Sequence, residues 1–368
     1  MPAAIAMTDS DEPSRDASVD RPATAGRLKR AVSLIVGVPT WIIVVATALL
    51  LATAWLWHYD PAAKGSVATR LQALLFMART YQFPFALLLL TSSAVALLVS
   101  RGRLALIALL AAMPLLAMEA WLILPGGSSR QGTGPVIRVA SMNVYSRNGD
   151  TASIVSAARE MNADVLVLQE FNTWNNGRAA EIEALSEMYP YRVLPRDLSR
   201  LVGMRAVFSR LPIEPANAHP NARQDFTRHR LEVVLDGGQH LAIYNVHHSS
   251  PGTVEKVMVN LQQAESLVTS LPQEEMPAVW LGDFNAPTWS PQLVGLKAAG
   301  LTEAFDAAAV GRGTTWPTGT HHGLLDYLPA VRLDNIFVNA GVVPVAAGVG
   351  PDTGSDHRPV WADLQLAR

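Results

Sequence analysis

The sequence predicts an α/β domain built on mixed β-sheets, preceded by three transmembrane helices. Three long uncharged runs in the first third of the 368 residues predict the helices, and a charged fraction of only 16% agrees with them. Over residues 136–368, short apolar strands alternate with helical segments. Some consecutive strands leave no room for a crossover helix, so parallel and antiparallel pairs must mix in one domain.

The first 30 residues are expected to form a disordered tail, because they are too poor in large apolar side chains to offset the entropy of ordering. Residues 31–125 contain three runs that are long enough to span a bilayer, namely Leu34–Trp57, Tyr81–Ser100 and Leu104–Pro125. The first run is too long for a signal-peptide core and is expected to stay in the protein. Glu119 interrupts the third run near its end, which favours an interfacial position over a functional carboxylate inside the membrane.

The charges around these runs predict their orientation. Basic residues precede the first run and fill the short second loop, and the positive-inside rule places both on the cytoplasmic side (Arg27, Lys29, Arg30, Arg101 and Arg103). Basic residues in the first loop weaken this orientation without reversing it (Lys64, Arg70 and Arg79). Three spans then place the remainder of the chain on the far side. We therefore expect a protein of the plasma (inner) membrane with its large domain on the extracytoplasmic side.

Residues 126–135 are rich in glycine and serine and predict a flexible linker. Beyond it, the sequence predicts alternating short strands and helices. Helices are predicted at Thr151–Met161, opened by a threonine cap, and at Thr253–Leu271. Strands are predicted at Val136–Val144, Ala163–Gln169, Arg205–Ser209, Arg230–Leu235, Leu241–Val246, Ala278–Leu281, Leu333–Val338 and Val360–Leu366.

Composition excludes several function classes. The absence of cysteine excludes disulfides, thiolate metal sites and a cysteine nucleophile. Residues 130–368 carry 19 Lys and Arg against 24 Asp and Glu, a net charge of −5. A protein that coats nucleic acid through a basic groove would show the opposite balance, so that class is disfavoured.

Polar residues gather at the ends of the apolar strands. Each one alone is most simply a turn residue, a solvated loop residue or a structural histidine. Together they are harder to dismiss, because buried carboxylates need partners or a cation, and ligand sites of layered α/β domains collect at strand ends. These residues are Asn143, Gln169, Glu170, His247, His248, Asp283, Asn285, Asp334, Asp356 and His357.

Three segments carry a resemblance to a known family: L-Q-E at 168–170, G-D-F-N at 282–285 and G-S-D-H-R-P-V at 354–360. Supporting pieces are S-M-N-V at 141–144, the strand end at Asn245–His247, T-W-P at 315–317 and R-L-D-N-I-F-V at 332–338. In this order they resemble the endonuclease/exonuclease/phosphatase superfamily, from residue 136 onward. The resemblance implies a four-layer, deoxyribonuclease-like α/β sandwich of two sheets, with its site where the strand ends meet.

The resemblance also implies roles for individual residues. Glu170 would be the main ligand of Mg²⁺, helped by Asn143 and Asp356, and Mn²⁺ often substitutes in such oxygen sites. Asp334 would orient His357. The expected catalytic residues are Asp283, His357, His247, Asn285 and Asp334, with Asp283 as the base for water, Asn285 on a phosphate oxygen and His357 as phosphate stabiliser or acid.

Two points stay open at the level of sequence. Strand alternation lets only one of His247 and His248 face the site, and His247 is preferred because Asn245 then falls where the family has asparagine. Either Asp283 or His357 could activate the water. The residues that follow Glu170 could form a rim of the pocket or an ordinary loop (Trp174, Asn175 and Asn176), and His321 and His322 are expected in a surface loop. Loops 195–203 and 216–228 are expected to set specificity.

The sequence therefore favours a membrane-anchored, Mg²⁺-dependent phosphoesterase that acts on a lipid-type or small substrate at the outer face of the membrane, since tethering concentrates lipid headgroups. The first alternative is an extracytoplasmic endonuclease or exonuclease. Nucleic acid is not favoured as a partner because of the acidic balance and because no long basic insertion is present. The second alternative, a non-catalytic binding protein on the same fold, is disfavoured because no expected catalytic residue is lost.

Overall fold

The computed structural model describes residues 21–60, 65–99, 101–122, 132–174, 177–195, 204–214, 228–319, 323 and 330–367. Several sequence predictions fall outside these residues. They are the first 20 residues of the expected tail, most of the expected linker, most of the two specificity loops, and Asn175, Asn176, His321 and His322.

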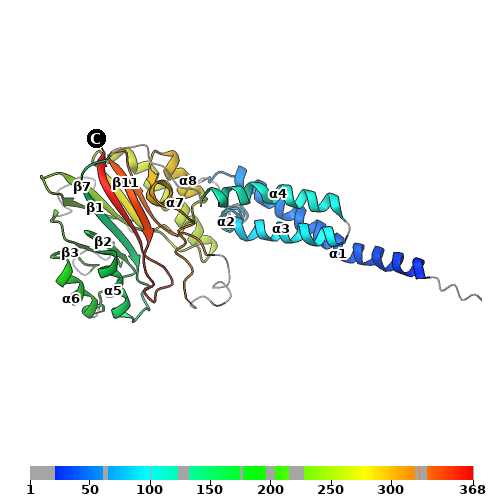
Figure 1. The fold of residues 1–368 in the computed structure, drawn as a ribbon. Coiled ribbons are helices and arrows are strands. Elements are labelled where there is room, and N and C mark those ends of the chain that lie inside the picture. Colours follow the sequence, from blue (N-terminus) through cyan, green and yellow to red (C-terminus); the bar gives the residue numbers. More distant parts are fainter. Residues whose placement is uncertain are drawn as a thin grey trace, which may run out of the picture.

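The N-terminal part is a bundle of four helices, drawn in blue and cyan in Figure 1: α1 (Arg21–Leu56), α2 (Ser66–Thr80), α3 (Gln82–Leu98) and α4 (Gly102–Trp121). Two of them contain segments long and apolar enough to cross a membrane, Arg30–Leu56 and Gly102–Trp121. A third span requires α2 and α3 to count as one, and these two meet at a bend of 71°. The run predicted as the second span corresponds to α3, a helix of 17 residues. Helix α2 precedes it, in a segment that the sequence predicts to be a loop.

The larger part is a sandwich of two six-stranded sheets. The first sheet has the strand order β11-β12-β1-β2-β4-β3, and the second has the order β5-β6-β7-β8-β10-β9. In the first sheet, the strands are β1 (Gly132–Asn143), β2 (Val165–Gln169), β3 (Tyr191–Val193), β4 (Ala206–Ser209), β11 (Val342–Val349) and β12 (Val360–Ala367). In the second sheet, they are β5 (Ile213–Glu214), β6 (Arg228–Val234), β7 (His240–His247), β8 (Ala278–Asp283), β9 (Thr302–Glu303) and β10 (Asp334–Val338).

Each sheet contains one parallel pair, β1–β2 and β7–β8, and the other neighbouring strands are antiparallel. The mixture follows from the chain, because each parallel pair is bridged by a helix that is long enough to cross over. These crossovers are α5 (Thr151–Met161) and α7 (Val254–Ser270). The remaining elements are α6 (Ala179–Met188), α8 (Pro291–Ala298), α9 (Ala304–Ala308) and a short 3₁₀ turn at Leu271–Gln273.

Three apolar clusters hold the four layers together. Val139, Val167, Ile243 and Leu281 belong to the central cluster, where the sheets face each other. A second cluster packs α5 and α6 on the outer face of the first sheet, and a third packs α7 and α8 on the second. Strands β2 and β8 are buried along their whole length. The expected two-sheet, four-layer sandwich is confirmed.

Local differences from the sequence predictions have physical reasons. Helix α5 is capped by Asp150, whose carboxylate accepts the Ser153 amide at 3.0 Å, and not by the expected threonine. A carboxylate is the stronger acceptor at the positive end of a helix. Strand β11 was not predicted, because Pro344 and Gly348 are poor strand formers, and such residues are tolerated at the edge position that β11 occupies.

The helical bundle and the sandwich meet on the side of α7 and α8 (Figure 1). Ala73 and Phe76 of α2 pack on Val257 and Leu261 of α7. Arg312 forms an ion pair of 3.1 Å with Glu119 of α4, and its guanidinium lies 4.4 Å from the ring centroid of Phe83. A small hollow at this junction is also lined by Pro287, Thr288 and Trp289, from the loop that follows β8. That loop therefore lies against the ends of the helices.

Candidate active site

The polar strand ends converge on one edge of the sandwich. The parallel strands β1 and β2 both end there, at Asn143 and just before Glu170, and β7 and β8 end there at His247 and Asp283. Strands β10 and β12 run the other way, so Asp334 and His357 reach the same edge from the starts of their strands. Asn143 joins the two sheets, because its Nδ2 donates to Asp283 Oδ2 at 3.1 Å. The fold thus brings together residues that lie far apart in the sequence.

The Asp283 carboxylate is the centre of this arrangement and is 1% exposed. Its Oδ2 accepts from Asn285 Nδ2 at 2.9 Å and from Asn143, and its Oδ1 accepts from the Asn285 backbone amide at 2.8 Å. Burial raises the pKa of Asp283 to about 7, although the neighbouring His357 and the hydrogen bonds oppose the rise. A carboxylate whose pKa lies near neutrality can accept and release a proton under ordinary conditions.

His357 and Asp334 form a short buried pair, with 2.8 Å between His357 Nδ1 and Asp334 Oδ2. Burial alone would lower the pKa of His357, but the carboxylates of Asp334 and Asp283 outweigh it and raise that pKa to about 10. The ring therefore carries a positive charge at neutral pH, and its Nε2 lies 3.8 Å from Asp283 Oδ2. Such a fixed imidazolium can stabilise negative charge that develops on a phosphoryl group.

The two consecutive histidines differ in position. His247 Nε2 lies 3.9 Å from Asp283 Oδ2, whereas the ring of His248 packs edge-on against Phe284, with 5.4 Å between centroids. His247 is thus the histidine beside the Asp283 carboxylate. Burial, and then the charge of Arg205, lower the pKa of His247 to about 4, so its ring is neutral at pH 7.

Glu170, Asn143 and Asp356 offer the oxygen atoms that a hard divalent cation prefers. Glu170 Oε1 lies 3.4 Å from Asn143 Nδ2, and Glu170 Oε2 accepts the Ser146 amide at 2.9 Å. Ser355 links Asp356 to this pair, because its Oγ contacts Asp356 Oδ1 at 3.4 Å and donates to the Asn143 carbonyl at 2.8 Å. Glu170 and Asp356 thus offer carboxylate oxygens of the kind that divalent cations bind, while Asn143 turns its Nδ2 toward Glu170 and its Oδ1 toward the Tyr145 amide.

Asp283, Asp334 and His357 also lie close enough to one another to surround a metal ion. The 2.8 Å contact between His357 Nδ1 and Asp334 Oδ2 is a hydrogen bond, with no space for a cation between the two atoms. In this arrangement His357 and Asp334 are a hydrogen-bonded pair, with Asp283 3.8 Å from His357 Nε2.

Backbone strain marks the same edge. Tyr145, Glu170 and Asn285 have φ values of 50°, 56° and 48°, in the left-handed region that non-glycine residues seldom adopt. Each such residue costs about 1 kcal/mol or more, and the surrounding structure must hold it there. Hydrogen bonds do so: Asn143 Oδ1 accepts the Tyr145 amide at 3.0 Å, and Asp283 accepts the amide of Asn285.

Some residues of the site were not singled out from the sequence. Arg205 is 2% exposed and donates from Nη2 to the His247 carbonyl at 3.3 Å. Thr315 of the T-W-P segment accepts the Asp334 amide through Oγ1 at 3.2 Å. Ser355 lies between the glycine and the aspartate of the G-S-D-H segment, where the sequence alone does not distinguish it from a spacer residue. A lone arginine at the start of an apolar strand, R-A-V-F, was the available signal for Arg205. Trp174 follows Glu170 at a half-buried position.

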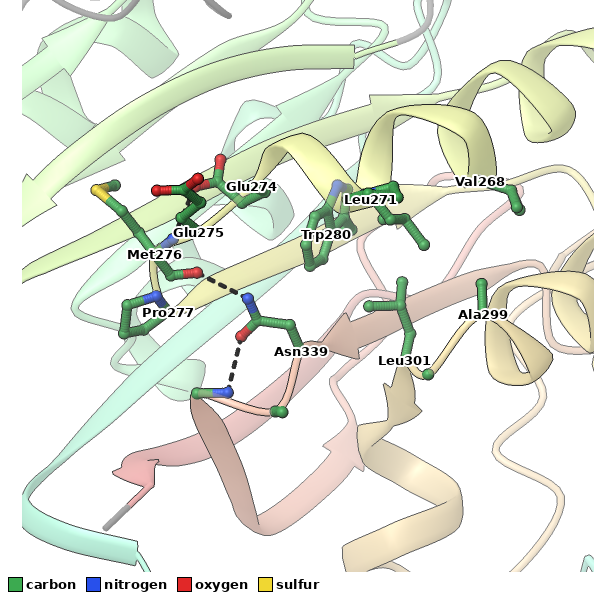
Figure 2. Close-up of a pocket in the computed structure, with 14 residues that line it drawn as sticks. Val268, Leu271, Glu274, Glu275, Met276, Pro277, Trp280, Ala299, Leu301 and Asn339 are labelled. Atoms are coloured by element: carbon green, nitrogen blue, oxygen red, sulfur yellow. Dashed lines mark hydrogen bonds between the residues drawn. The ribbon is translucent and has the colours of Figure 1, made fainter.

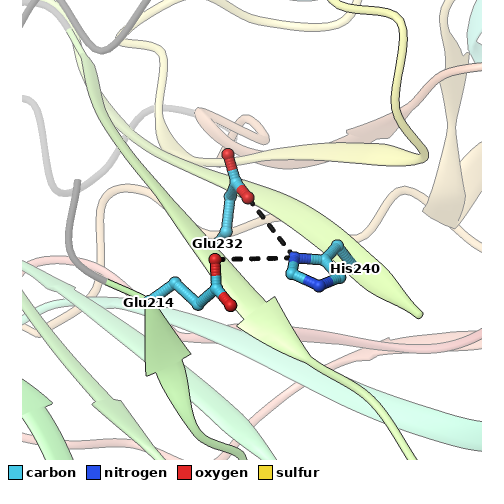
Figure 3. Close-up of side chains that lie close together, drawn as sticks. All are labelled: Glu214, Glu232 and His240. Atoms are coloured by element: carbon cyan, nitrogen blue, oxygen red, sulfur yellow. Dashed lines mark ion pairs between the residues drawn. The ribbon is translucent and has the colours of Figure 1, made fainter. Parts of the chain in front are cut away.

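A second cluster of potential metal ligands lies on β5, β6 and β7, outside this edge (Figure 3). His240 Nδ1 lies 3.4 Å from Glu232 Oε2 and 3.8 Å from Glu214 Oε2. Arg230 Nη1 pairs with the other oxygen of Glu232 at 2.6 Å, and Arg230 Nε pairs with Glu274 at 2.9 Å. The side chains of Glu214 and His240 are more than one-third exposed, so the cluster lacks the enclosure of the Asp283 site.

A cavity of about 510 Å³ lies between the end of α7 and β8 (Figure 2). Leu271, Met276, Trp280 and Leu301 give it an apolar wall, and Asn339 bridges the Met276 carbonyl and the Gly341 amide. It contains none of the residues predicted for the active site. We therefore place the chemistry at the Asp283 edge and not in this cavity.

Comparisons with known proteins bear on the family and the fold. The model of the Endonuclease/Exonuclease/phosphatase family matches residues 140–357, more than half of the chain. No curated protein matches the sequence.

Solved structures with a similar chain path include an endonuclease/exonuclease/phosphatase from Beutenbergia cavernae, at 19% identity over 64% of this chain and 72% of that one, with a TM-score of 0.47. A beta toxin from Staphylococcus aureus is 16% identical over 61% of this chain and 99% of that one, with a TM-score of 0.48. A mannosyl-6-phosphatase from Bacteroides thetaiotaomicron is 18% identical over 62% and 99%, with a TM-score of 0.43.

Proposed function

Because this chain belongs to the Endonuclease/Exonuclease/phosphatase family, whose members generally hydrolyse phosphoester bonds, we propose that it is a membrane-anchored, metal-dependent phosphoesterase. The observation that carries the proposal is the buried group of Asp283, His357 and Asp334, in which Asp283 also accepts a hydrogen bond from Asn143. A carboxylate with a pKa near 7 beside an imidazole that is charged at neutral pH is the kind of perturbed pair that catalytic sites use.

In this proposal each side chain has one task. Asp283 Oδ2 takes a proton from the attacking water, and its hydrogen bonds from Asn143 and Asn285 hold the carboxylate in one orientation. His357 carries the positive charge that stabilises the phosphoryl oxygens, and Asp334 keeps that ring charged and oriented. His247, which is neutral, can share a hydrogen bond with a phosphate oxygen or with the leaving group.

Glu170, Asn143 and Asp356 would hold a divalent cation, Mg²⁺ or Mn²⁺, which neutralises charge on the substrate phosphate when bound. Their oxygen-only donor set supports this assignment.

We further propose that the substrate is a lipid-type phosphoester, or a small one presented at the membrane. The support is the position of the loop that follows β8. This loop starts directly after Asp283 and Asn285, and its Trp289 lines the junction with Glu119 and Phe83 of the helices. With the helices inserted in the plasma membrane, the active edge would lie near the bilayer surface, on the extracytoplasmic side. Lipid headgroups are most concentrated there.

The experiment is to measure phosphate or alcohol release by the full chain in detergent. The substrates are sphingomyelin, phosphatidylinositol, a phosphomonoester panel and plasmid DNA, each with Mg²⁺, with Mn²⁺ and with EDTA. We expect metal-dependent turnover of a lipid, reduced about 10²–10⁴-fold in Asp283→Asn, because that variant keeps the shape but not the base. Asp236→Asn is the matched control, since Asp236 is an exposed carboxylate in the β6–β7 turn.

Each outcome decides between named alternatives. Nicking of DNA without lipid turnover would replace the lipid substrate by the nuclease alternative. Equal turnover by Asp283→Asn and the parent chain would refute the assigned base. A folded chain that turns over none of the substrates and binds no Mg²⁺ would favour the non-catalytic reading.

A further inference from the structure

A second candidate site lies in the helical bundle, at the end remote from the sandwich. A cavity of about 620 Å³ opens between the start of α4 and the first half of the apolar part of α1. The residues that line it include Val38, Trp41, Arg101, Arg103, Leu104 and Ile107. Its volume lies in the range of cavities that bind small organic ligands.

The arginines of this cavity are positioned differently. Arg101 is fixed on α1, because its Nε donates to Ser33 Oγ at 3.0 Å and its Nη2 donates to the Ser33 carbonyl at 3.3 Å. Gly37 makes room for it, since a Cβ at that position would lie 3.1 Å from Arg101 Nε. Arg103 makes no hydrogen bond or ion pair within the described part of the chain. None of its five donors is therefore taken up by another residue of the part of the chain that the structure describes.

The charge of the cavity selects the ligand. None of the described residues that line it is acidic, so two guanidinium groups face the hollow without a carboxylate to balance them. Guanidinium groups bind phosphate through paired, charge-assisted hydrogen bonds, which are stronger than those to an uncharged ligand. The cavity therefore fits an anion.

The remaining walls give the ligand its second property. Val38, Leu104 and Ile107 are apolar and lie further along the two helices from the end that carries the arginines. Trp41 adds an aromatic ring of the kind that sits at the headgroup level of membranes. A ligand with a phosphate at one end and a hydrocarbon chain along the apolar wall is a phospholipid of the bilayer.

We propose that this cavity binds an anionic glycerophospholipid, with its phosphate on Arg101 and Arg103 and part of an acyl chain along the apolar wall. Basic pockets between membrane helices bind acidic headgroups in this way. The proposal rests on the insertion of the helices proposed above, and it concerns a site separate from the catalytic edge. Such a lipid would bridge α1 and α4 and fix the anchor of the enzyme in membranes of the matching charge.

The test uses the full chain in nanodiscs and in detergent. Binding of phosphatidylglycerol, phosphatidylcholine and inorganic phosphate is followed by native mass spectrometry and by the shift of the unfolding midpoint. We expect preference for phosphatidylglycerol, weakened about five-fold in Arg103→Gln and about thirty-fold in Arg101→Gln/Arg103→Gln, since each basic group near the headgroups contributes about that factor. Arg103→Lys keeps the charge and should keep most of the binding, which separates loss of charge from loss of folding.

Arg70→Gln is the matched control, because Arg70 is an exposed arginine of α2, at the end of the bundle that faces the sandwich. It should bind phosphatidylglycerol as the parent does. Equal affinity of the double variant, equal binding of phosphatidylcholine, or full occupation by inorganic phosphate alone would each overturn the lipid site. Release of the chain from membranes by alkaline carbonate would overturn membrane insertion, and with it both the membrane-anchored function and the lipid site. If the chain stays in the membrane and the double variant binds lipid as the parent does, only the lipid site is overturned.

Discussion

Substitution of Gly282 by alanine is expected to disable the active edge. Gly282 has a φ of 147° and pairs with Val246 across the parallel strands β7 and β8. A Cβ at this position would lie 1.9 Å from the Val246 carbonyl oxygen, so the strands cannot keep their spacing. Asp283 follows directly and pairs with His247 one step further along the register. The two groups of the site would therefore be pushed apart.

The size of the effect follows from two costs. A non-glycine residue held in this region of φ costs about 1–3 kcal/mol. Forcing an extra carbon into a buried, close-packed position costs about 1–3 kcal/mol more. We expect Gly282→Ala to lower the free energy of unfolding by about 2–6 kcal/mol. A displacement of about 1 Å at a catalytic group also lowers turnover by about 100-fold.

The assay is urea unfolding of the full chain in detergent, followed by tryptophan fluorescence, together with phosphoester turnover. Gly295→Ala is the matched control, because Gly295 lies in α8 and a Cβ there would meet no atom within 4 Å. Alanine in a helix is more favourable than glycine by about 0.5–1 kcal/mol, so the control should gain stability. A Gly282→Ala chain with parental stability and turnover would refute the reasoning.

Three further predictions concern buried polar groups. Burial, and then the charge of Arg205, lower the pKa of His229 to about 4. As the pH falls from 6.5 to about 4, His229 is therefore protonated in the unfolded chain but not in the folded one. The free energy of unfolding should fall by about 3 kcal/mol over this range. His229→Leu should flatten this part of the pH profile, measured by urea unfolding; an unchanged slope would contradict it. Burial raises the pKa of Asp306, but Arg332 and Lys297 outweigh it and hold that pKa at about 2. The resulting stability is complete above pH 4 and is lost as the pH falls toward 2, so Asp306→Asn should cost about 2 kcal/mol at pH 7 and little at pH 2. Asn245→Leu should cost about 3 kcal/mol in the same assay, because two buried backbone carbonyls lose their donor; a smaller loss than that of an exposed Asn→Leu change would argue against it.

The sequence predicted most of the secondary structure through local signals. Alternation and apolar runs located nearly all of the long strands, because a buried strand needs apolar residues along its length, as in β2 and β8. It missed β5 and β9, which are two residues long and exist only through their pairing with β6 and β10. It also missed α2, a helix whose mixed composition resembles a loop between spans.

Residues of the candidate site could be predicted where a polar side chain stands at the end of an apolar strand. They could not be predicted where their role depends on residues far away in the sequence. Glu170, Asp283 and His357 interrupt or bound apolar strands, and such interruptions are costly unless they serve a purpose. Arg205 became part of the site only because β4 lies beside β2, where its guanidinium reaches the His247 carbonyl. No periodicity in the sequence encodes that contact.

By itself, the sequence determined the apolar helices, an α/β domain with mixed sheets and the identity of the polar residues at the strand ends, because composition and periodicity decide what can be buried; the two-sheet sandwich was implied by the resemblance of its motifs to a known family. Only the tertiary structure decided which histidine of the pair lies beside Asp283, which carboxylate keeps His357 charged, and that the loop after β8 lies against the helices. These are distances between residues far apart in the chain. The electrostatic work of bringing buried charges together is set by those distances and not by the residue types alone.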